Sequence, residues 1–482
     1  MKLFPFGAQP KGFAILFYAQ FCERYGFYTS FYLLVPFAIG TLGLSQINAT
    51  LLFGTYTGLI FSTAFAGGII GDRLLGYRKS ITAGLILMGC GSLLLASGST
   101  TIVYFGLALM LVGNGYFMPN VSSLLGLQFS KEDTRRDSTF TLFYISTNIG
   151  AAAAALCSGV LARQFGFPSA FLFATAVTLT ACVPLYVRGG GLKGDDVQEA
   201  RRRLWRTDAL GVPNLAWLAL GTSGAVVLGH LMLNHTRFTG GVLFAALGLA
   251  LAYFLREILR LEEQSRRNGV VMILLFGFGV IFWALYNQNG ASVLLFAEQA
   301  VDRTIFGAEI PASAFLSLNP IFIFISAPAM ALLWLYLSSR QVSISYGLRF
   351  VAGFVLIGGA FALLGLVPQG PDNLVAARWI IGFFFIYSIA ELCISPIALS
   401  MISHLATKEL LGFAMGLWLL IHAVGNYSSG LLAGLASVPS GASAQETVTV
   451  GQSAFLDFSL IALSAGVLLF LLFPVLNRLT KA

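Results

Sequence analysis

The sequence consists largely of long apolar runs separated by short polar segments. Most runs are about 20 residues or longer, which is the length of an α-helix that crosses a bilayer. Of the 482 residues, 57% are hydrophobic and 10% are charged, whereas about 25% of the residues in a soluble globular domain are charged. So few polar side chains cannot cover a water-soluble core of this size. The sequence therefore predicts an all-α membrane protein with many spanning helices.

Counting the apolar runs predicts fourteen spanning helices. We expect them at residues 12–40, 49–71, 80–99, 102–128, 138–164, 168–187, 209–231, 238–256, 270–299, 315–339, 347–368, 374–405, 410–435 and 454–477. A polar, arginine-rich segment at 188–208 follows the sixth helix. If the next two helices are an inserted pair, the remaining twelve form two groups of six, as in many secondary transporters. We therefore expect an N-terminal six-helix bundle at 1–187, a cytoplasmic linker with an inserted two-helix hairpin at 188–268, and a C-terminal six-helix bundle at 269–482.

Positive charges are distributed unequally between the two predicted sides of the membrane. With the N-terminus inside, most lysines and arginines fall on that side, and the other side receives Arg163, Arg237, Arg303 and Arg378. Since basic loops remain in the cytoplasm, we expect both termini to be cytoplasmic and no signal peptide to be cleaved. Topology and attraction to anionic lipid explain the net charge of +8, so no nucleic-acid partner is needed.

The cysteines and the short motifs point away from enzymes and metal sites. All five cysteines lie in apolar runs without a CxxC pair, which is typical of small buried side chains. The sequence contains no HExxH, no GxxxxGK[ST] and no GxSxG motif. We therefore exclude fuelling by ATP within this chain and expect no cofactor.

Three charged residues lie deep inside predicted helices, away from the loops, where a charge costs about 2.5 kcal/mol or more. Glu23 and Arg24 lie in the first helix and Glu391 lies in the twelfth. The first two either form an ion pair that locks their helix to a neighbour or line a water-filled path. Glu391 precedes Ser395-Pro396, where we expect proline to break the helix and free a carbonyl. A broken helix beside a buried carboxylate favours a cation or amine site over a structural role.

Polar and aromatic side chains accumulate in the same helices. They include Tyr144 and Asn148, then Trp283, Asn287 and Gln288, then Asn319, and finally Trp418, His422 and Asn426. Such aromatic residues often serve packing or anchor a helix at the membrane interface. Because hydrocarbon penalises unpaired amides, the set together predicts one polar cavity.

Several motifs carry a resemblance to a known family. Gln20–Tyr28 (QFCERYGFY) is similar to the signature ExxERFxYY, and further matches are Gly71–Lys79, Gly115–Asn120, Phe143–Gly150, Phe282-Trp283 with Gln288, Ser317–Pro320, Glu391–Pro396 and Met415–Trp418. These motifs span nearly the whole chain. The chain resembles the proton-dependent oligopeptide transporters of the major facilitator superfamily. The resemblance implies twelve core helices in two bundles plus the inserted pair that bacterial members carry, and hence a bacterial inner membrane.

The resemblance also implies roles for individual residues. It assigns substrate binding to Glu391, Tyr28, Tyr144, Asn148, Trp283, Gln288, Asn319, Ser395 and Trp418, with Glu391 near the amino group of the peptide. It assigns coupling or gating to Glu23 and Arg24, and conformational change to the cytoplasmic motif around Asp72 and Arg73.

Four coupling or gating positions depart from the family pattern. A glutamate is replaced by Gln20, a lysine by Met118, an arginine by Phe31, and an acidic residue by Asn287. In the family these positions serve proton movement and hold the carboxylate of the peptide. Replacing both members of a buried ion pair is often neutral, whereas replacing one leaves an uncompensated charge. Gln20 with Met118 resembles such a double replacement. The sequence leaves open whether Arg24 takes over recognition of a carboxylate.

Two hypotheses follow. The first is a transporter of a small peptide-like or amine-bearing solute that works by alternating access, with proton coupling altered or lost. The second is a transporter-like receptor or scaffold that binds such a ligand without net transport. The retained motif around Asp72 and Arg73 favours the first. We expect a monomer in the lipid bilayer, and the sequence leaves the solute, the direction of transport and the role of protons open.

Overall fold

Helices make up nearly all of the computed structural model. It describes residues 9–10, 12–129, 133, 135–189, 192, 197–207, 211–305, 307–340, 345–370, 374–439 and 441–480. Both chain ends, which are predicted to be cytoplasmic, lie outside this part of the chain.

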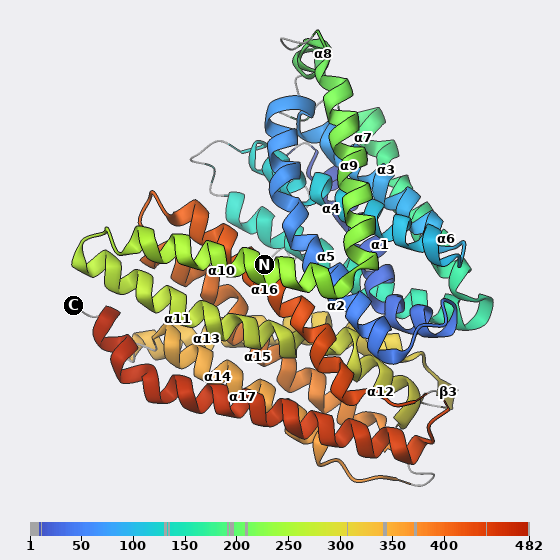
Figure 1. The fold of residues 1–482 in the computed structure, drawn as a ribbon, viewed down its shortest axis with the longest axis vertical. Helices are drawn as coiled ribbons and strands as arrows, with labels where there is room; N and C mark the ends of the chain where they lie inside the picture. The colour runs from blue at the N-terminus through green and yellow to red at the C-terminus, as the bar shows by residue number, and fades with distance from the viewer. Residues whose placement is uncertain are drawn as a thin grey trace. The chain divides into compact units, whose positions relative to one another are not determined.

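The helices follow one another with short connections (Figure 1). They are α1 (Phe13–Gly40), α2 (Gln46–Ile70), α3 (Tyr77–Leu95), α4 (Thr100–Gly126), α5 (Arg136–Phe165), α6 (Phe167–Thr180), α7 (Cys182–Arg188), α8 (Val197–Trp205), α9 (Asn214–Asn234), α10 (Thr236–Ile258), α11 (Glu263–Tyr286), α12 (Ser292–Ala300), α13 (Leu318–Ser339), α14 (Tyr346–Gly365), α15 (Ala377–Leu405), α16 (Leu411–Ala433) and α17 (Ala444–Thr480). A π-helical turn, Gly71–Leu75, follows α2, and 3-10 turns occupy Asn287–Gly290, Ala312–Ser317 and Gly434–Ala436. The short strands are β1 (Val301–Asp302), β2 (Thr304–Ile305), β3 (Ala308–Glu309) and β4 (Val375–Ala376). β1 pairs with β4 in parallel, and β2 pairs with β3 antiparallel.

Thirteen helical segments in the described part of the chain are long and apolar enough to cross a membrane. Helix α1 is not among them, although it is 28 residues long. Glu23 and Arg24 lower its hydropathy, and the structure buries both of these side chains inside the protein. The all-helical membrane fold is confirmed, and the count of fourteen spans stays a prediction.

The chain divides into two compact units. Unit 1 contains the chain up to Phe37 together with Leu59–His235, and unit 2 contains Ala38–Gly58 together with the chain from Thr236 onward. Helix α9 therefore belongs to unit 1, where it packs on α4, and α10 belongs to unit 2, where it packs on α16. The two helices of the predicted insertion thus fall in different units, and the three-part division of the sequence stays a prediction.

Glycines allow the helices of unit 1 to approach one another closely. A Cβ atom on Gly84 of α3 would lie 2.7 Å from the carbonyl oxygen of Gly113 on α4. Two helical turns further along α3, a Cβ on Gly91 would lie 2.6 Å from the carbonyl oxygen of Gly106 on α4. Small residues at helix crossings permit the backbone contact on which packing in lipid depends. The two glycine pairs explain why α3 and α4 form an extensive contact.

Unit 2 is built around similar close contacts. Figure 1 shows α14 and α17 running side by side, and these two helices pack against each other along their length. The first half of α2 also belongs to this unit, where it meets α16. A Cβ on Gly54 would lie 2.8 Å from the backbone nitrogen of Gly430. The α2 and α16 backbones are therefore in direct contact.

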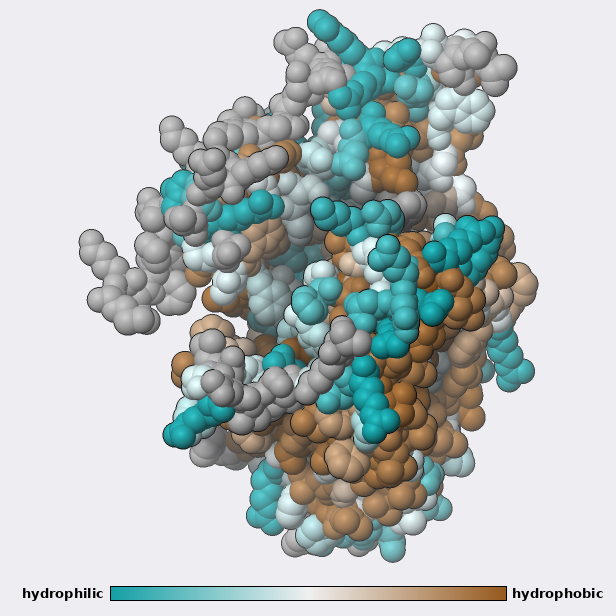
Figure 2. Space-filling model, turned by 90° about the vertical axis from the view of Figure 1, so that its left-hand side faces the viewer, coloured by the Kyte–Doolittle hydropathy of each residue, from teal (hydrophilic) through white to brown (hydrophobic). Residues whose placement is uncertain are grey.

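Apolar side chains cover much of the exterior. Figure 2 shows a broad hydrophobic area across the lower part of the molecule, with hydrophilic residues along its bottom edge. Large apolar residues remain exposed on α10, α13 and α17, with Leu249, Leu332 and Leu471 each more than 60% exposed. An exposed apolar surface of this kind fits a lipid environment, where no polar coat is needed.

The expected helix break at Pro396 is wrong. Helix α15 continues from Ala377 to Leu405 with Pro396 inside it. Proline removes one backbone donor, but the flanking turns are held by the neighbouring helices α13, α14 and α16, which pack on α15. Tertiary packing therefore keeps the helix continuous where the local sequence favours an interruption.

Candidate functional site

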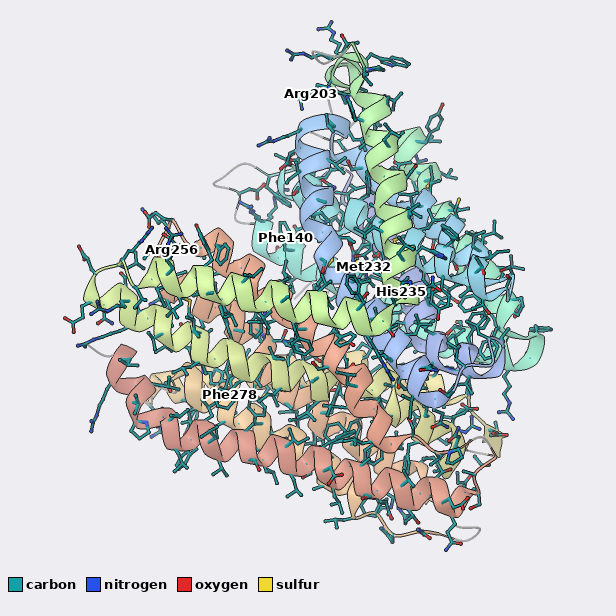
Figure 3. All side chains as sticks on the ribbon, viewed as in Figure 1. Phe140, Arg203, Met232, His235, Arg256 and Phe278 are labelled. Carbon is teal, nitrogen blue, oxygen red and sulfur yellow. The ribbon has the colours of Figure 1, made fainter. Side chains whose placement is uncertain are left out.

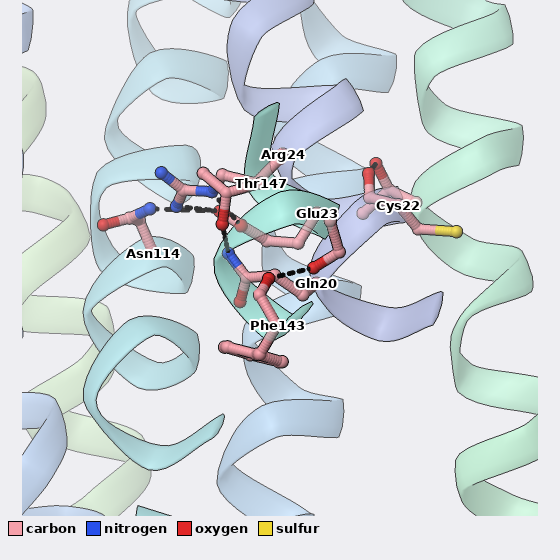
Figure 4. A network of polar contacts seen from close by, with 9 residues as sticks. Gln20, Cys22, Glu23, Arg24, Asn114, Phe143 and Thr147 are labelled. Atoms are coloured by element: carbon pink, nitrogen blue, oxygen red, sulfur yellow. Dashed lines mark hydrogen bonds and ion pairs between the residues drawn. The ribbon is translucent and has the colours of Figure 1, made fainter. Parts of the chain in front are cut away.

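The two charges of helix α1 form an ion pair with each other. Arg24 Nε lies 2.5 Å from Glu23 Oε2, and Arg24 Nη2 donates to Glu23 Oε1 at 2.6 Å. Asn114 of α4 donates to the same Oε1 at 3.2 Å, and the guanidinium lies 4.9 Å from the centroid of the Phe27 ring. Figure 4 shows this network between α1 and α4. With Glu23 0% and Arg24 8% exposed, the arrangement matches the ion-pair alternative, which ties α1 to its neighbour.

Helix α5 also contacts the cluster around Glu23 and Arg24. Gln20 Nε2 donates to Thr147 Oγ1 at 3.1 Å (Figure 4), and a Cβ on Gly150 would lie 2.8 Å from the Cβ of Arg24. Two predicted substrate residues lie on this helix. Tyr144 is 54% exposed, and Asn148 is half-buried and donates to the Tyr144 carbonyl at 3.0 Å. Unit 1 therefore presents Tyr144 and Asn148 outside a buried charged cluster.

In unit 2, three helices meet at the carboxyl group of Glu391. The Tyr286 hydroxyl, from the last residue of α11, donates to Glu391 Oε2 at 2.6 Å. Asn319 of α13 donates to the same oxygen at 3.1 Å and also contacts Ser388 Oγ at 3.1 Å. Ser388 lies on α15 with Glu391 and donates to the Phe384 carbonyl at 2.7 Å. The acid is thus half-buried in a neutral hydrogen-bonded setting.

Three members of this cluster were missed from the sequence. Tyr286 binds the carboxyl group directly, Ser388 contacts Asn319, and the Tyr387 hydroxyl donates to the Tyr286 carbonyl at 2.6 Å. Helical spacing could have indicated them, because Tyr387 and Ser388 precede Glu391 by four and three positions and so share its face. Tyr286 follows Trp283 by three positions in the same way.

Neighbouring amides in unit 2 are paired with one another and with the backbone. Asn287 Nδ2 donates to Asn426 Oδ1 at 2.5 Å and lies 3.0 Å from the Trp283 carbonyl. Asn426 Nδ2 in turn donates to the carbonyl of Thr57 on α2 at 3.2 Å. We call the series from Asn287 through Asn426 to Thr57 the amide relay. It connects the 3-10 turn after α11 with α16 and α2, without a charged group.

Two other predicted substrate residues of unit 2 are fully enclosed. Gln288 donates to the carbonyls of Ala284 and Ser429 at 3.0 and 2.9 Å and accepts from Ser292 at 2.7 Å. Trp418 is buried against Gly279 and the rings around it. Both residues therefore support the packing of α11 and α16 in this conformation.

The ring of Trp283 lies against His422. Their ring centroids are 3.8 Å apart, and Trp283 Nε1 has no hydrogen-bond partner among the described residues. Ser395 is half-buried one turn beyond Glu391 on α15. Asn319, Tyr286 and Ser395 are thus less deeply buried than Gln288 and Trp418.

The motif of Asp72 and Arg73, which is predicted to be cytoplasmic, lies at the π-helical turn after α2. Asp72 and Arg73 are both exposed, and Arg203 Nη1 of α8 donates to the Asp72 carbonyl at 3.1 Å. Figure 3 marks Arg203 on α8. The turn is thus linked to the arginine-rich helix that follows the first six spans. Among the described residues, no three His, Cys, Asp or Glu side chains come together as a metal site would require.

The comparison with protein families decides the relationship. The model of the POT family matches residues 78–449. This chain belongs to the POT family. Dipeptide and tripeptide permease A of Chromobacterium violaceum is 30% identical over 98% of this chain and 94% of its own length, and the permease of the same name from Salmonella typhimurium is 30% identical with the same coverage.

Solved structures agree with this POT family membership. A peptide transporter POT in complex with sulfate is similar with a TM-score of 0.84, 26% identity, and coverage of 99% of this chain and 97% of that chain. A second solved structure, reported for substrate recognition in proton dependent oligopeptide transporters, is similar with a TM-score of 0.82 and 25% identity. The match covers 97% of this chain and 99% of that chain. The fold is that of the major facilitator transporters, and the protein is a multi-pass membrane protein from a family of transporters, not of enzymes.

The four positions that depart from the POT family pattern carry uncharged side chains. Gln20 contacts Thr147, and Asn287 belongs to the amide relay. Phe31 is buried with its ring centroid 6.0 Å from Phe27. Met118 is exposed on α4. Gln20 and Asn287 thus make hydrogen bonds with neutral groups and Phe31 makes an aromatic contact, where the family pattern has ionisable side chains.

Proposed function

We propose that this POT family protein carries small peptide-like, amine-bearing solutes across the bacterial inner membrane by alternating access. The observation that carries the proposal is the setting of Glu391. This carboxyl group lies within a membrane-spanning helix, and its hydrogen-bond partners in the described residues are the neutral groups of Tyr286 and Asn319. An acid held at membrane depth without a basic partner is suited to receive a cation from the solute.

The relatives support peptides as the solute class. The permeases that match almost the whole chain are named for dipeptides and tripeptides. Near Glu391, Asn319 offers an amide of the kind that recognises a peptide bond, while Ser395 adds a hydroxyl. Arg24 is paired with Glu23 through Nε and Nη2. A free carboxylate of the solute would have to compete with Glu23 for this guanidinium. We therefore propose that an amine group contributes more to binding than a carboxylate does.

We also propose that coupling to protons is altered relative to the family. A group that moves a proton must be ionisable, and Gln20, Met118, Phe31 and Asn287 are not. The amide relay supports this proposal, because Asn287 has a neutral partner in Asn426. Rearrangement of the relay exchanges hydrogen bonds without a change of charge, so it does not itself depend on pH.

Counterflow in proteoliposomes tests the proposal. Vesicles loaded with unlabelled dialanine amide should take up labelled dialanine amide, with a rate that changes less than about threefold between pH 5.5 and 7.5. Glu391→Gln should abolish this uptake, since the carboxylate that attracts the ammonium is lost. Glu409→Gln, which changes an exposed acid in the loop before α16, is the matched control and should leave uptake unchanged.

The outcomes separate the alternatives. Binding of dialanine amide in a thermal-shift titration without any exchange of label would favour the receptor that binds without transport. Strong uptake of ordinary dipeptides driven by an acid gradient would contradict the altered coupling. Tighter binding of free dialanine than of its amide would contradict the proposed preference for an amine over a carboxylate.

A further inference from the structure

We propose that Tyr286 and Tyr387 are positioning residues that make Glu391 selective for a primary ammonium group over a guanidinium group. The inference rests on the proposed function, in which Glu391 receives the cation of the solute. The inference explains which kind of cation Glu391 prefers. It assigns this preference to two uncharged residues.

The first step is the unequal use of the two carboxyl oxygens. Glu391 Oε2 accepts from the Tyr286 hydroxyl at 2.6 Å and from Asn319 Nδ2 at 3.1 Å. A carboxylate oxygen has two lone pairs, so these donors fill Oε2. Glu391 Oε1 has no hydrogen-bond partner among the described residues. A solute therefore finds one open oxygen rather than two.

The second step is the rigidity of Tyr286. Its ring stacks on the Tyr387 ring with centroids 4.5 Å apart and planes inclined by 13°. The Tyr387 hydroxyl also donates to the Tyr286 carbonyl at 2.6 Å. Tyr286 is the last residue of α11, and carbonyls at the end of a helix lack their regular partners. Tyr387 thus fixes both the backbone and the ring of Tyr286.

The contact is anchored from the α15 side as well. Tyr387 is fully buried and lies four residues before Glu391, so both side chains share one face of α15. Ser388, also fully buried, contacts Asn319 Nδ2 at 3.1 Å. The two donors to Oε2 are therefore each held by a buried neighbour, and the carboxyl group has little freedom to turn.

The third step is the chemistry of the cation. A guanidinium presents its donors as a planar fork and binds a carboxylate best through both oxygens. An ammonium is a compact charge with donors that turn freely, and one oxygen is enough for it. With Oε2 occupied, the fork loses one of its two hydrogen bonds while the ammonium loses none. The site should consequently favour the terminal amine of a peptide-like solute.

Binding to the full-length protein in detergent tests this inference with two probes. Dialanine amide carries an ammonium, and the same molecule with its amine converted to a guanidine carries the fork. We expect the wild type to bind the ammonium probe about tenfold more tightly, which is the factor that one charge-assisted hydrogen bond supplies. Tyr286→Phe should reduce this ratio to about threefold or less, because Oε2 becomes available to the guanidinium.

Tyr387→Phe is the second variant, and it keeps the stacked ring while removing the hydroxyl. It should also reduce the ratio, since Tyr286 loses its anchor. Tyr116→Phe is the matched control, because its hydroxyl makes a comparable 2.6 Å contact with Thr222 in unit 1. It should leave the ratio unchanged. A general loss of structural integrity would weaken both probes alike, so the ratio is insensitive to it.

Failure of the inference and failure of the proposed function give different results. If Glu391→Gln weakens the ammonium probe but neither tyrosine variant changes the ratio, the positioning role is overturned and the proposed function stands. The positioning role is also overturned if the wild type binds the guanidine probe more tightly and Tyr286→Phe leaves the ratio of the two affinities unchanged. The proposed function stands in that case too. If Glu391→Gln leaves binding of the ammonium probe unaffected, the proposed function itself is wrong.

Discussion

Glu23 and Arg24 are adjacent in sequence, yet they form a bidentate ion pair within one helix. Their side chains leave the helix about 100° apart, and both bend toward Asn114 on α4. Breaking a buried pair by removing one partner costs much more than removing both. A substitution that removes one charge of the pair should therefore destabilise the protein more than a double substitution that removes both charges.

Glu23→Gln should lower the free energy of unfolding by about 3–5 kcal/mol, because it removes the carboxylate with which Arg24 pairs. The double variant Glu23→Gln with Arg24→Met should recover most of this loss. Unfolding of the purified protein in detergent, followed by circular dichroism, measures both.

The control for this measurement is an exposed pair. Arg267→Gln breaks the contact with Glu263 on the surface of α11 and should cost less than about 1 kcal/mol. Equal losses in the single and the double variant would show that the pair is not the source of the effect.

At the scale of elements, α2 and α16 cross in close contact in unit 2. Gly54 and Gly430 allow backbone contact there, and the amide relay reaches the Thr57 carbonyl one turn further along α2. Close packing and the relay act on the same pair of helices. The crossing is therefore sensitive to the volume of a single methyl group.

Gly54→Ala should lower the free energy of unfolding by about 1–3 kcal/mol, since overpacking forces a backbone shift. The added Cβ would lie 2.8 Å from the Gly430 nitrogen and 2.9 Å from the Asn426 carbonyl oxygen. Gly248→Ala on α10 is the matched control, because a Cβ there meets nothing within 4 Å. This control should leave the free energy of unfolding unchanged or raise it by up to about 1 kcal/mol, because alanine has the higher helix propensity. A Gly54→Ala protein as stable as the wild type would contradict the tight crossing.

At the scale of the whole molecule, charge and hydropathy together determine how the chain lies in a membrane. The arginine-rich helix α8 lies on the predicted cytoplasmic side, and the hairpin of β2 and β3 lies on the predicted outer side. Arg303 connects the hairpin to its surroundings through Glu298 at 3.3 Å and Glu309 at 3.0 Å. These two regions are suitable reporters of orientation.

Cysteine labelling of intact cells tests the predicted orientation. Ala308→Cys, at an exposed position in β3, should react with a membrane-impermeant thiol reagent added from outside. Arg202→Cys, exposed on α8, should react only after the membrane is permeabilised, because basic loops remain in the cytoplasm. The unmodified protein controls for its own five cysteines. The reverse pattern would contradict the assignment of both termini to the cytoplasm.

The sequence by itself determined the class of fold, the family and the acidic residue at the centre of the proposed site. Hydropathy is a property of each segment, so the spanning helices could be predicted without knowing their neighbours. The same holds for Glu391, because a charge inside an apolar run is visible locally. Motifs such as Gln20–Tyr28 indicated the POT family before any contact was known.

Only the tertiary structure decided which polar groups meet. Tyr286 and Glu391 are 105 positions apart, and Asn287 and Asn426 are 139 positions apart, so no local pattern joins them. The helix through Pro396 stayed continuous because its neighbours pack on it, and no property of the local segment contains that information. Pairing depends on how distant helices are brought together, which is why the contact between Tyr286 and Glu391 appears only in the folded protein.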